Sequence, residues 1–167
     1  MQGNTPEKTT KLKLDEISSP MLAYLGDAVI ELLVRRKLAL DGVPNTGEAN
    51  RLSHGYVTAK AQSEAVGRLE GLLTEREEDI YRRGRNHASK NCPRRSTPGQ
   101  YHRATGLEAL FGRLWLEHEF DRIEELFAAA YPACLGNPAC FGNPACLNNT
   151  PCDKNTTDTE DENAPTT

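Results

Sequence analysis

Hydrophobic residues recur at intervals of three and four over most of the first 131 positions, which is the pattern of helices with one buried face. The clearest case is Met21–Leu40, a run rich in leucine and valine. Ser18 and Pro20 supply its start, because serine suits the position before a helix and proline suits the first turn. Gly42 and Pro44 break the chain after it. No segment alternates with the two-residue period of a strand, so the pattern predicts an all-α fold.

Weaker patterns predict further helices in the rest of this region. One of them is short and begins with the pairing of Thr74 with Glu77 three residues later, which is typical of a capping box. The stretch 82–99 contains glycine, proline and serine, and we expect a surface loop there. The expected helices are Glu48–Glu70, Thr74–Tyr81, Tyr101–Leu116 and Asp121–Tyr131.

The chain divides into a polar N-terminal segment at 1–17, one folded domain at 18–131 and a tail at 132–167. The tail repeats the pattern PACLGN and places a cysteine at every sixth position from Cys134 to Cys152. It has few large apolar residues, so we expect disorder, with a metal or redox module as the alternative. No run is long enough to span a membrane or resembles a secretory signal, so we expect a soluble, cytoplasmic protein.

Charge is distributed unevenly along the chain. The formal net charge of −4 disfavours a nucleic-acid partner if it is spread evenly, but residues 82–106 contain seven lysines and arginines and no acid. A wholly basic segment on a neutral body is the pattern expected of a phosphate-binding surface. A solvated loop is the simpler alternative.

Two acidic residues lie inside the most apolar predicted helices. Asp27 stands in LAYLGDAVIEL and Glu108 in ATGLEALFG. A buried carboxylate is costly, so such residues are paired with an arginine, bound to metal or placed at a cleft edge. Because two acids occur in matching contexts with no close histidine or cysteine, the metal interpretation is favoured, and Mg²⁺ is the ion that suits such ligands. A Mg²⁺ site beside a basic surface suggests phosphodiester chemistry.

The segment LAYLGDAVIEL resembles the signature helix of the ribonuclease III family. The blocks LSHGYVTAKAQ, RRGRN and YHRATGLEALFGRLWL follow in the family order, so the resemblance covers roughly residues 20–127. The chain is similar to the small branch, Mini-ribonuclease III, because it has no room for the separate double-stranded-RNA-binding domain of the larger enzymes.

The resemblance implies that Asp27 and Glu108 are the catalytic residues and Mg²⁺ ligands. Two further acidic positions of the larger enzymes fall on Ala23 and Thr105. The implied activity is Mg²⁺-dependent cleavage of double-stranded RNA during maturation of the large-subunit (23S) ribosomal RNA precursor, leaving 5′-phosphate and 3′-hydroxyl ends. A non-catalytic double-stranded-RNA-binding or ribosome-assembly dimer is the alternative, although a pure binder has no need for buried acids.

The resemblance also implies a homodimer formed through the signature helix, and a ribosomal protein that presents the RNA is a further candidate partner. The interface candidates are Tyr24, Leu25, Ala28 and Val29, although the core of a single chain would demand similar residues.

The candidate RNA-binding residues come mainly from the basic segment, where they would contact phosphates and 2′-hydroxyls of A-form RNA. One lies in the TAKAQ block, where a plain surface lysine is the alternative. The set is Lys60, Arg82, Arg83, Arg85, Asn86, Lys90, Arg94 and Arg95.

Overall fold

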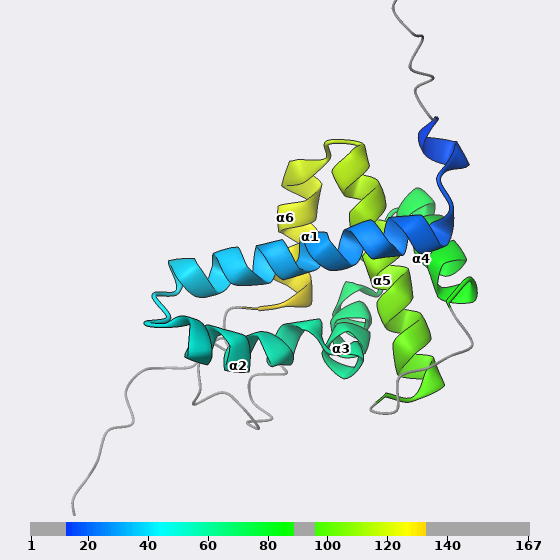
Figure 1. The fold of residues 1–167 in the computed structure, drawn as a ribbon. Helices are drawn as coiled ribbons and strands as arrows, with labels where there is room; N and C mark the ends of the chain where they lie inside the picture. Colours follow the sequence, from blue (N-terminus) through cyan, green and yellow to red (C-terminus); the bar gives the residue numbers. More distant parts are fainter. Residues whose placement is uncertain (1–12, 89–95, 133–167) are drawn as a thin grey trace, which may run out of the picture. The chain divides into compact units, whose positions relative to one another are not determined.

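The computed structural model describes residues 13–88 and 96–132. They form helices without any strand, so the predicted all-α fold is confirmed (Figure 1). A short 3₁₀ helix at Leu14–Glu16 precedes α1 (Ser19–Leu40), α2 (Thr46–Val57), α3 (Ala59–Leu69), α4 (Glu75–Asn86), α5 (Pro98–Leu116) and α6 (Phe120–Ala130).

Helix α5 lies at the centre of the fold. It contacts α1, α3, α4 and α6, while α2 packs along α1. Figure 1 shows α1 running across α5 and α2 running back beneath α1. Three large apolar residues in the middle of α5 are 0% exposed, namely Leu107, Leu110 and Phe111. Burial of these large apolar side chains supplies the main driving force for folding.

Two capping boxes define where α4 and α5 begin. The predicted box at Thr74 and Glu77 is present, and a second joins Thr97 to Gln100. In each box, the N-cap hydroxyl accepts from the backbone N–H three residues later, and the side chain there accepts from the N-cap N–H. The Glu77 carboxylate also accepts from Arg122 of α6 at 2.9 Å, which ties the start of α4 to the C-terminal helix.

The helical region predicted over Glu48–Glu70 consists of two helices, because the chain breaks at Thr58. This residue has extended backbone angles (φ −72°, ψ 148°) and its hydroxyl accepts from the Ala61 N–H at 3.3 Å. Thr58 therefore ends α2 and caps α3. A threonine side chain can satisfy local backbone groups in this way, and the hydrophobic spacing does not reveal it.

The predicted loop at 82–99 is helical at both ends. Residues 82–86 form the last turns of α4, and Pro98 and Gly99 belong to the first turn of α5. Arginine is a good helix former, and cations near a helix C-terminus interact favourably with its dipole. Residues 89–95, and with them Lys90, Arg94 and Arg95, lie outside the described residues, as do the predicted tail and its cysteines.

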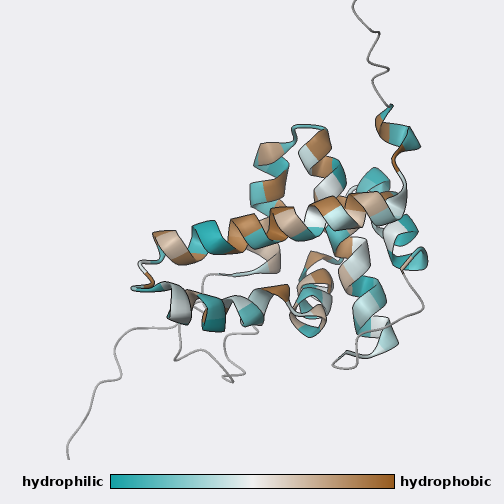
Figure 2. Ribbon diagram, in the orientation of Figure 1, coloured by the Kyte–Doolittle hydropathy of each residue, from teal (hydrophilic) through white to brown (hydrophobic). Residues whose placement is uncertain are grey.

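Helix α1 is less completely buried than its hydrophobic pattern suggested. Leu32 and Leu40 are 53% and 75% exposed, so they do not belong to the core. Figure 2 shows hydrophobic and hydrophilic turns mixed along α1, whereas α4 is largely hydrophilic. None of the described helices combines the length and apolar character needed to cross a membrane.

Candidate active site

The site is built on the crossing of α1 and α5, where two glycines let the backbones touch. A Cβ atom added at Gly26 would lie 2.6 Å from the backbone carbon of Glu108 and closer still to its oxygen. A Cβ atom at Gly112 would lie 2.9 Å from the backbone carbon of Leu22. Only residues without a side chain allow this approach. Since Asp27 follows Gly26 directly, the crossing itself brings the two acids together.

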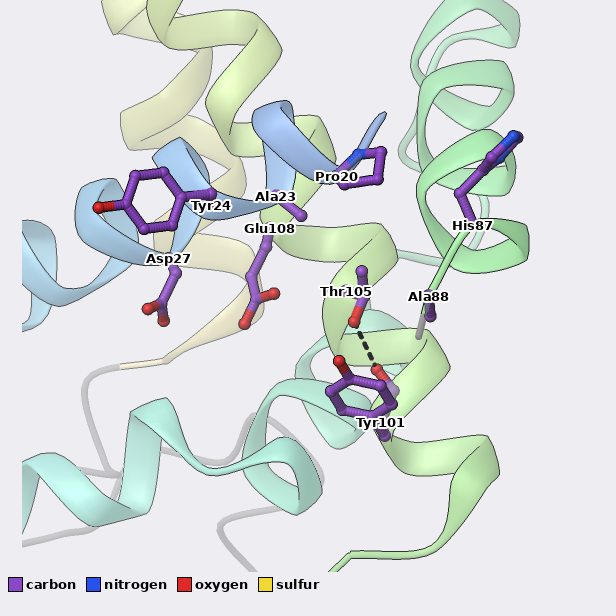
Figure 3. Close-up of a pocket in the computed structure, with 9 residues that line it drawn as sticks. All are labelled: Pro20, Ala23, Tyr24, Asp27, His87, Ala88, Tyr101, Thr105 and Glu108. Atoms are coloured by element: carbon purple, nitrogen blue, oxygen red, sulfur yellow. Dashed lines mark hydrogen bonds between the residues drawn. The ribbon is translucent and has the colours of Figure 1, made fainter. Parts of the chain in front are cut away.

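A pocket of about 390 Å³ opens at this crossing. Asp27 and Glu108 both line it, and Figure 3 shows their carboxylates projecting in the same direction from α1 and α5. Asp27 is exposed, while Glu108 is partly buried. The described residues that line the pocket are Pro20, Ala23, Tyr24, Asp27, His87, Ala88, Tyr101, Thr105 and Glu108.

Neither carboxylate of the pocket is neutralised by an arginine or lysine among the described residues. Within the described parts of the chain, neither acid forms an ion pair with an arginine or lysine, which argues against the arginine-paired alternative. Burial, followed by the negative charge of Asp27, raises the pKa of Glu108 to about 7. Burial and then Glu31 raise the pKa of Asp27 above its ordinary value. Bringing a cation between the two acids would relieve this repulsion.

The chemistry of the donors fits a hard divalent cation. No cluster of three or more histidine, cysteine, aspartate or glutamate side chains able to hold a metal ion occurs at 13–88 or 96–132. Two carboxylates alone suit Mg²⁺, which keeps several waters and binds proteins through one or two carboxylates together with phosphate oxygens. They would not suit a structural zinc site, which needs four nitrogen or sulfur ligands.

The resemblance to the larger enzymes places two of their further acidic positions on residues of this chain that also lie in the pocket. Ala23 and Thr105 line it beside Asp27 and Glu108. The Thr105 hydroxyl donates to the Tyr101 backbone oxygen at 3.0 Å, drawn as a dashed line in Figure 3. Thr105 is therefore engaged within its own helix, which leaves two carboxylates in this pocket.

Four lining residues were not anticipated from the sequence. Tyr101 precedes Thr105 and Glu108 at helical spacing, and this periodicity was a usable signal. Pro20 was noted only as a helix start. His87 and Ala88 reach the pocket because α4 is longer than predicted, and nothing in their local sequence indicated it.

The basic candidates are only partly gathered near the acids. Arg83, Arg85 and Asn86 are exposed at the end of α4, directly before His87 in the pocket wall. Arg82 pairs with Asp79 at 2.5 Å. Lys60 is exposed at the start of α3.

A second hollow lies between α3, α4 and α5, and its cationic lining residues are Arg82, Arg85 and Arg103. Arg103 was missed as a candidate, although it belongs to the basic segment. Glu70 and Glu78 also line this hollow, so its charge is mixed. Arg82 and Arg85 of α4 therefore line this second hollow and not the pocket of Asp27 and Glu108.

The four interface candidates differ in accessibility. Tyr24 is 77% exposed, Ala28 is exposed and Leu25 is partly buried. Val29 is only 3% exposed and belongs to the core of the single chain. The interface interpretation therefore does not extend to Val29, since a residue buried within its own chain has little surface to offer a partner.

We expect the variant Glu108→Gln to be more stable than wild type at pH 8 when metal is removed. Since the pKa of Glu108 rises from 4.5 to about 7 on folding, its contribution to stability is complete below pH 4.5 and is lost as the pH rises through 7. The amide carries no charge at any pH. Urea unfolding in the presence of a chelator should show a gain of roughly 1 to 3 kcal/mol at pH 8 and little difference at pH 4.5.

The matched control is Glu64→Gln, which changes an exposed acid of α3. It should leave the pH dependence of unfolding as in wild type. A Glu108→Gln protein no more stable than wild type at pH 8 would show that the carboxylate is not strained by its surroundings.

Comparisons with known proteins bear on the same helices. The family model of the Ribonuclease III domain matches residues 21–119. A Mini-ribonuclease 3 from Thermoanaerobacter is 40% identical over 120 residues, which is 72% of this chain and 84% of that relative. A Mini-ribonuclease 3 from Streptococcus pneumoniae is 37% identical over 112 residues, 66% of this chain and 88% of the relative.

A solved structure of a protein from Fusobacterium nucleatum has a TM-score of 0.62 and 32% sequence identity, covering 67% of this chain and 89% of its own. The family match spans both crossing helices and both acids of the pocket. The chain belongs to the ribonuclease III family and, within it, to the Mini-ribonuclease III branch.

Proposed function

We propose that this endoribonuclease cleaves double-stranded RNA with Mg²⁺ held by Asp27 and Glu108, and that its substrate is the precursor of 23S ribosomal RNA. Ribonuclease III membership supports the reaction type. The observation that carries the metal assignment is the pair of carboxylates lining one pocket with no ion-pair partner in the described residues. The substrate assignment rests on the resemblance to the small branch.

In the proposed mechanism, the chain holds the cation and positions the scissile phosphate. Asp27 and Glu108 supply carboxylate oxygens from two helices whose separation is set by the Gly26 contact. With two protein ligands, coordination positions remain for water and for phosphate oxygens. When bound, the divalent cation supplies Lewis acidity and charge neutralisation to in-line hydrolysis of a phosphodiester.

The exposure of Asp27 is important for substrate access. An RNA duplex cannot enter a deep cavity, so its phosphate must reach acids near the surface. Tyr24 and Tyr101 border the same pocket and present aromatic surface beside the acids. The end of α4 brings Arg83 and Arg85 to the region next to His87, where they would contact neighbouring phosphates.

We expect simultaneous replacement of Arg82, Arg83 and Arg85 by glutamine to weaken double-stranded-RNA binding for all sequences alike. When a phosphate contact is lost, fewer counterions are released as the RNA binds. The slope of log affinity against log salt concentration should therefore decrease in magnitude by roughly one for each lost contact. Filter binding or fluorescence anisotropy across a salt series measures both quantities.

The control replaces the same number of exposed arginines of α1 and α2, each of which is paired with an acid. If it weakened binding as much as the α4 variant, the effect would come from total charge and not from α4. The control set is Arg35, Arg36 and Arg51.

We propose that the exposed face of α1 forms a homodimer. Met21, Tyr24 and Leu32 are 56%, 77% and 53% exposed, and together with Ala28 they follow the spacing of one helix face. Such a face beside the acids would bring two pockets near one RNA duplex. Sedimentation should show a dimer for wild type and a shift toward monomer for Tyr24→Asp, whereas a monomeric wild type would contradict the proposal.

The function is tested by incubating the protein and Mg²⁺ with RNA containing the paired ends of a 23S precursor. We expect cuts at fixed positions within the paired region and none in a single-stranded control, with 5′-phosphate ends that a ligase accepts directly. Retarded but uncut RNA would favour the non-catalytic binding alternative. Equal cutting of unrelated duplexes would support the nuclease and reject the specific substrate.

A further inference from the structure

Gln62 is a buried polar residue whose amide has no ordinary partner. It lies on α3, which packs against α5, and it is 1% exposed. Its Nε2 atom makes no hydrogen bond in the part of the chain that the structure describes. Buried amide donors are nearly always satisfied, so an unsatisfied one in a native core needs an explanation.

The group on which Gln62 acts is the Glu108 carboxylate. Gln62 is near enough to Glu108 to lower the pKa of its carboxyl, against the larger effects of burial and of Asp27, which raise it. The nearby phenol of Tyr131 is already engaged, since its hydroxyl donates to the Tyr56 backbone oxygen at 3.2 Å. The pKa of Glu108 is therefore influenced by a buried amide on α3 and by the charge of Asp27 on α1.

A purely structural amide at this position would be disfavoured. Removing a polar group from water without completing its hydrogen bonds lowers stability, and an apolar side chain of the same length would pack as well. The free-energy cost of burying the Gln62 amide is offset if that amide donates a hydrogen bond to the Glu108 carboxylate. A carboxylate that binds a cation must also hold one orientation, and such ligands are commonly fixed by a second hydrogen bond.

We propose that Gln62 is a positioning residue, whose amide N–H donates to the Glu108 carboxylate and orients it for a divalent cation shared with Asp27. This inference rests on the proposed function of the Asp27 and Glu108 pair. Gln62 does not touch the substrate, and it acts only through Glu108.

The test uses Gln62→Met, which keeps the length of the side chain and removes the amide. Mn²⁺ serves as the probe, and its binding is measured by electron paramagnetic resonance on the full chain, together with the melting temperature of the metal-free protein. We expect Mn²⁺ affinity to fall about 10- to 100-fold, which is the usual effect of losing a hydrogen bond to a metal ligand. The melting temperature should stay the same or rise, because an unsatisfied donor has been removed.

The control is Leu69→Ala, which opens a cavity on the same helix, where Leu69 is 1% exposed. It should lower the melting temperature but leave Mn²⁺ affinity unchanged. Gln62→Met is expected to change Mn²⁺ affinity and Leu69→Ala is expected to change melting temperature, so the two measurements separate a positioning role from a packing role. Wild-type Mn²⁺ affinity in Gln62→Met would overturn the proposal, and so would a loss of affinity that Leu69→Ala reproduces.

Asp27→Asn and Glu108→Gln are measured in parallel. If these variants lose Mn²⁺ binding while Gln62→Met does not, the positioning role fails and the proposed function stands. If they bind Mn²⁺ like wild type, the metal site itself is wrong, and the role of Gln62 is overturned with it.

Discussion

Replacing Gly26 by alanine is expected to destabilise the protein severely and to abolish RNA cleavage. The new Cβ atom would overlap the backbone carbonyl of Glu108 and lie 2.7 Å from the backbone nitrogen of Gly112. Neither is a flexible side chain, so α1 and α5 must move apart. Overpacking of this kind costs several kcal/mol, and we expect a loss on the order of 3 to 5 kcal/mol in urea unfolding.

Gly67→Ala is the matched control, because Gly67 also lies within a helix but has room. A Cβ atom there meets the Arg103 side chain at 3.5 Å, an ordinary contact. Alanine has the higher helix propensity, so this variant should be as stable as wild type or up to about 1 kcal/mol more stable. Equal behaviour of the two variants would mean that α1 and α5 do not pack backbone to backbone.

Asp27→Asn and Glu108→Gln are each expected to reduce the single-turnover rate of double-stranded-RNA cleavage on the order of 10³-fold or more. Each amide keeps the shape of the side chain but removes a charged ligand, and loss of a single electrostatic contact to a transition state already costs about 10²- to 10³-fold. RNA affinity measured without metal should change little, since phosphate contacts come from the arginines.

Glu31→Gln provides the control for the loss of one acid from α1. Glu31 lies one turn beyond Asp27 but pairs with Arg35 at 2.7 Å and does not line the pocket. Its replacement should leave the cleavage rate within a few-fold of wild type. If Glu31→Gln were as damaging as Asp27→Asn, the general charge of α1 would matter more than a defined pair.

The helices could be predicted from the sequence more easily than their breaks and crossings. The three- and four-residue spacing of hydrophobic positions predicted Met21–Leu40, which the structure extends only to Ser19. It missed the break at Thr58, because apolar residues continue in register on both sides. Hydrophobic periodicity identifies which face of a helix is buried but not which helix covers it.

The acids of the site were identifiable because carboxylates are unusual within apolar helices. Their meeting in one pocket was not identifiable from periodicity alone, because it depends on the contact between Gly26 and Gly112. The expectation that Asp27 and Glu108 form one site came from the resemblance of the sequence blocks, in their order, to the ribonuclease III family. Physical reasoning from the residues reached only a suspected metal site.

Gln62 was not predicted as a site residue, although its neighbour Lys60 in the TAKAQ block was. In the TAKAQ block, the predicted RNA-binding residue Lys60 is exposed, whereas Gln62 is buried. A lone glutamine beside Ala61, Ala65 and Val66 is a polar residue on an apolar face. The same reasoning that singled out Asp27 applied to it.

Mn²⁺ binding to four proteins measures whether Asp27 and Glu108 hold one cation between them. Wild type, Asp27→Asn, Glu108→Gln and the double variant are titrated with Mn²⁺ under identical conditions. We expect wild type to bind, each single variant to lose most of its affinity, and the double variant to be little worse than either, because a shared site is lost with its first ligand. Wild-type affinity in either single variant, or independent additive losses, would contradict a shared site.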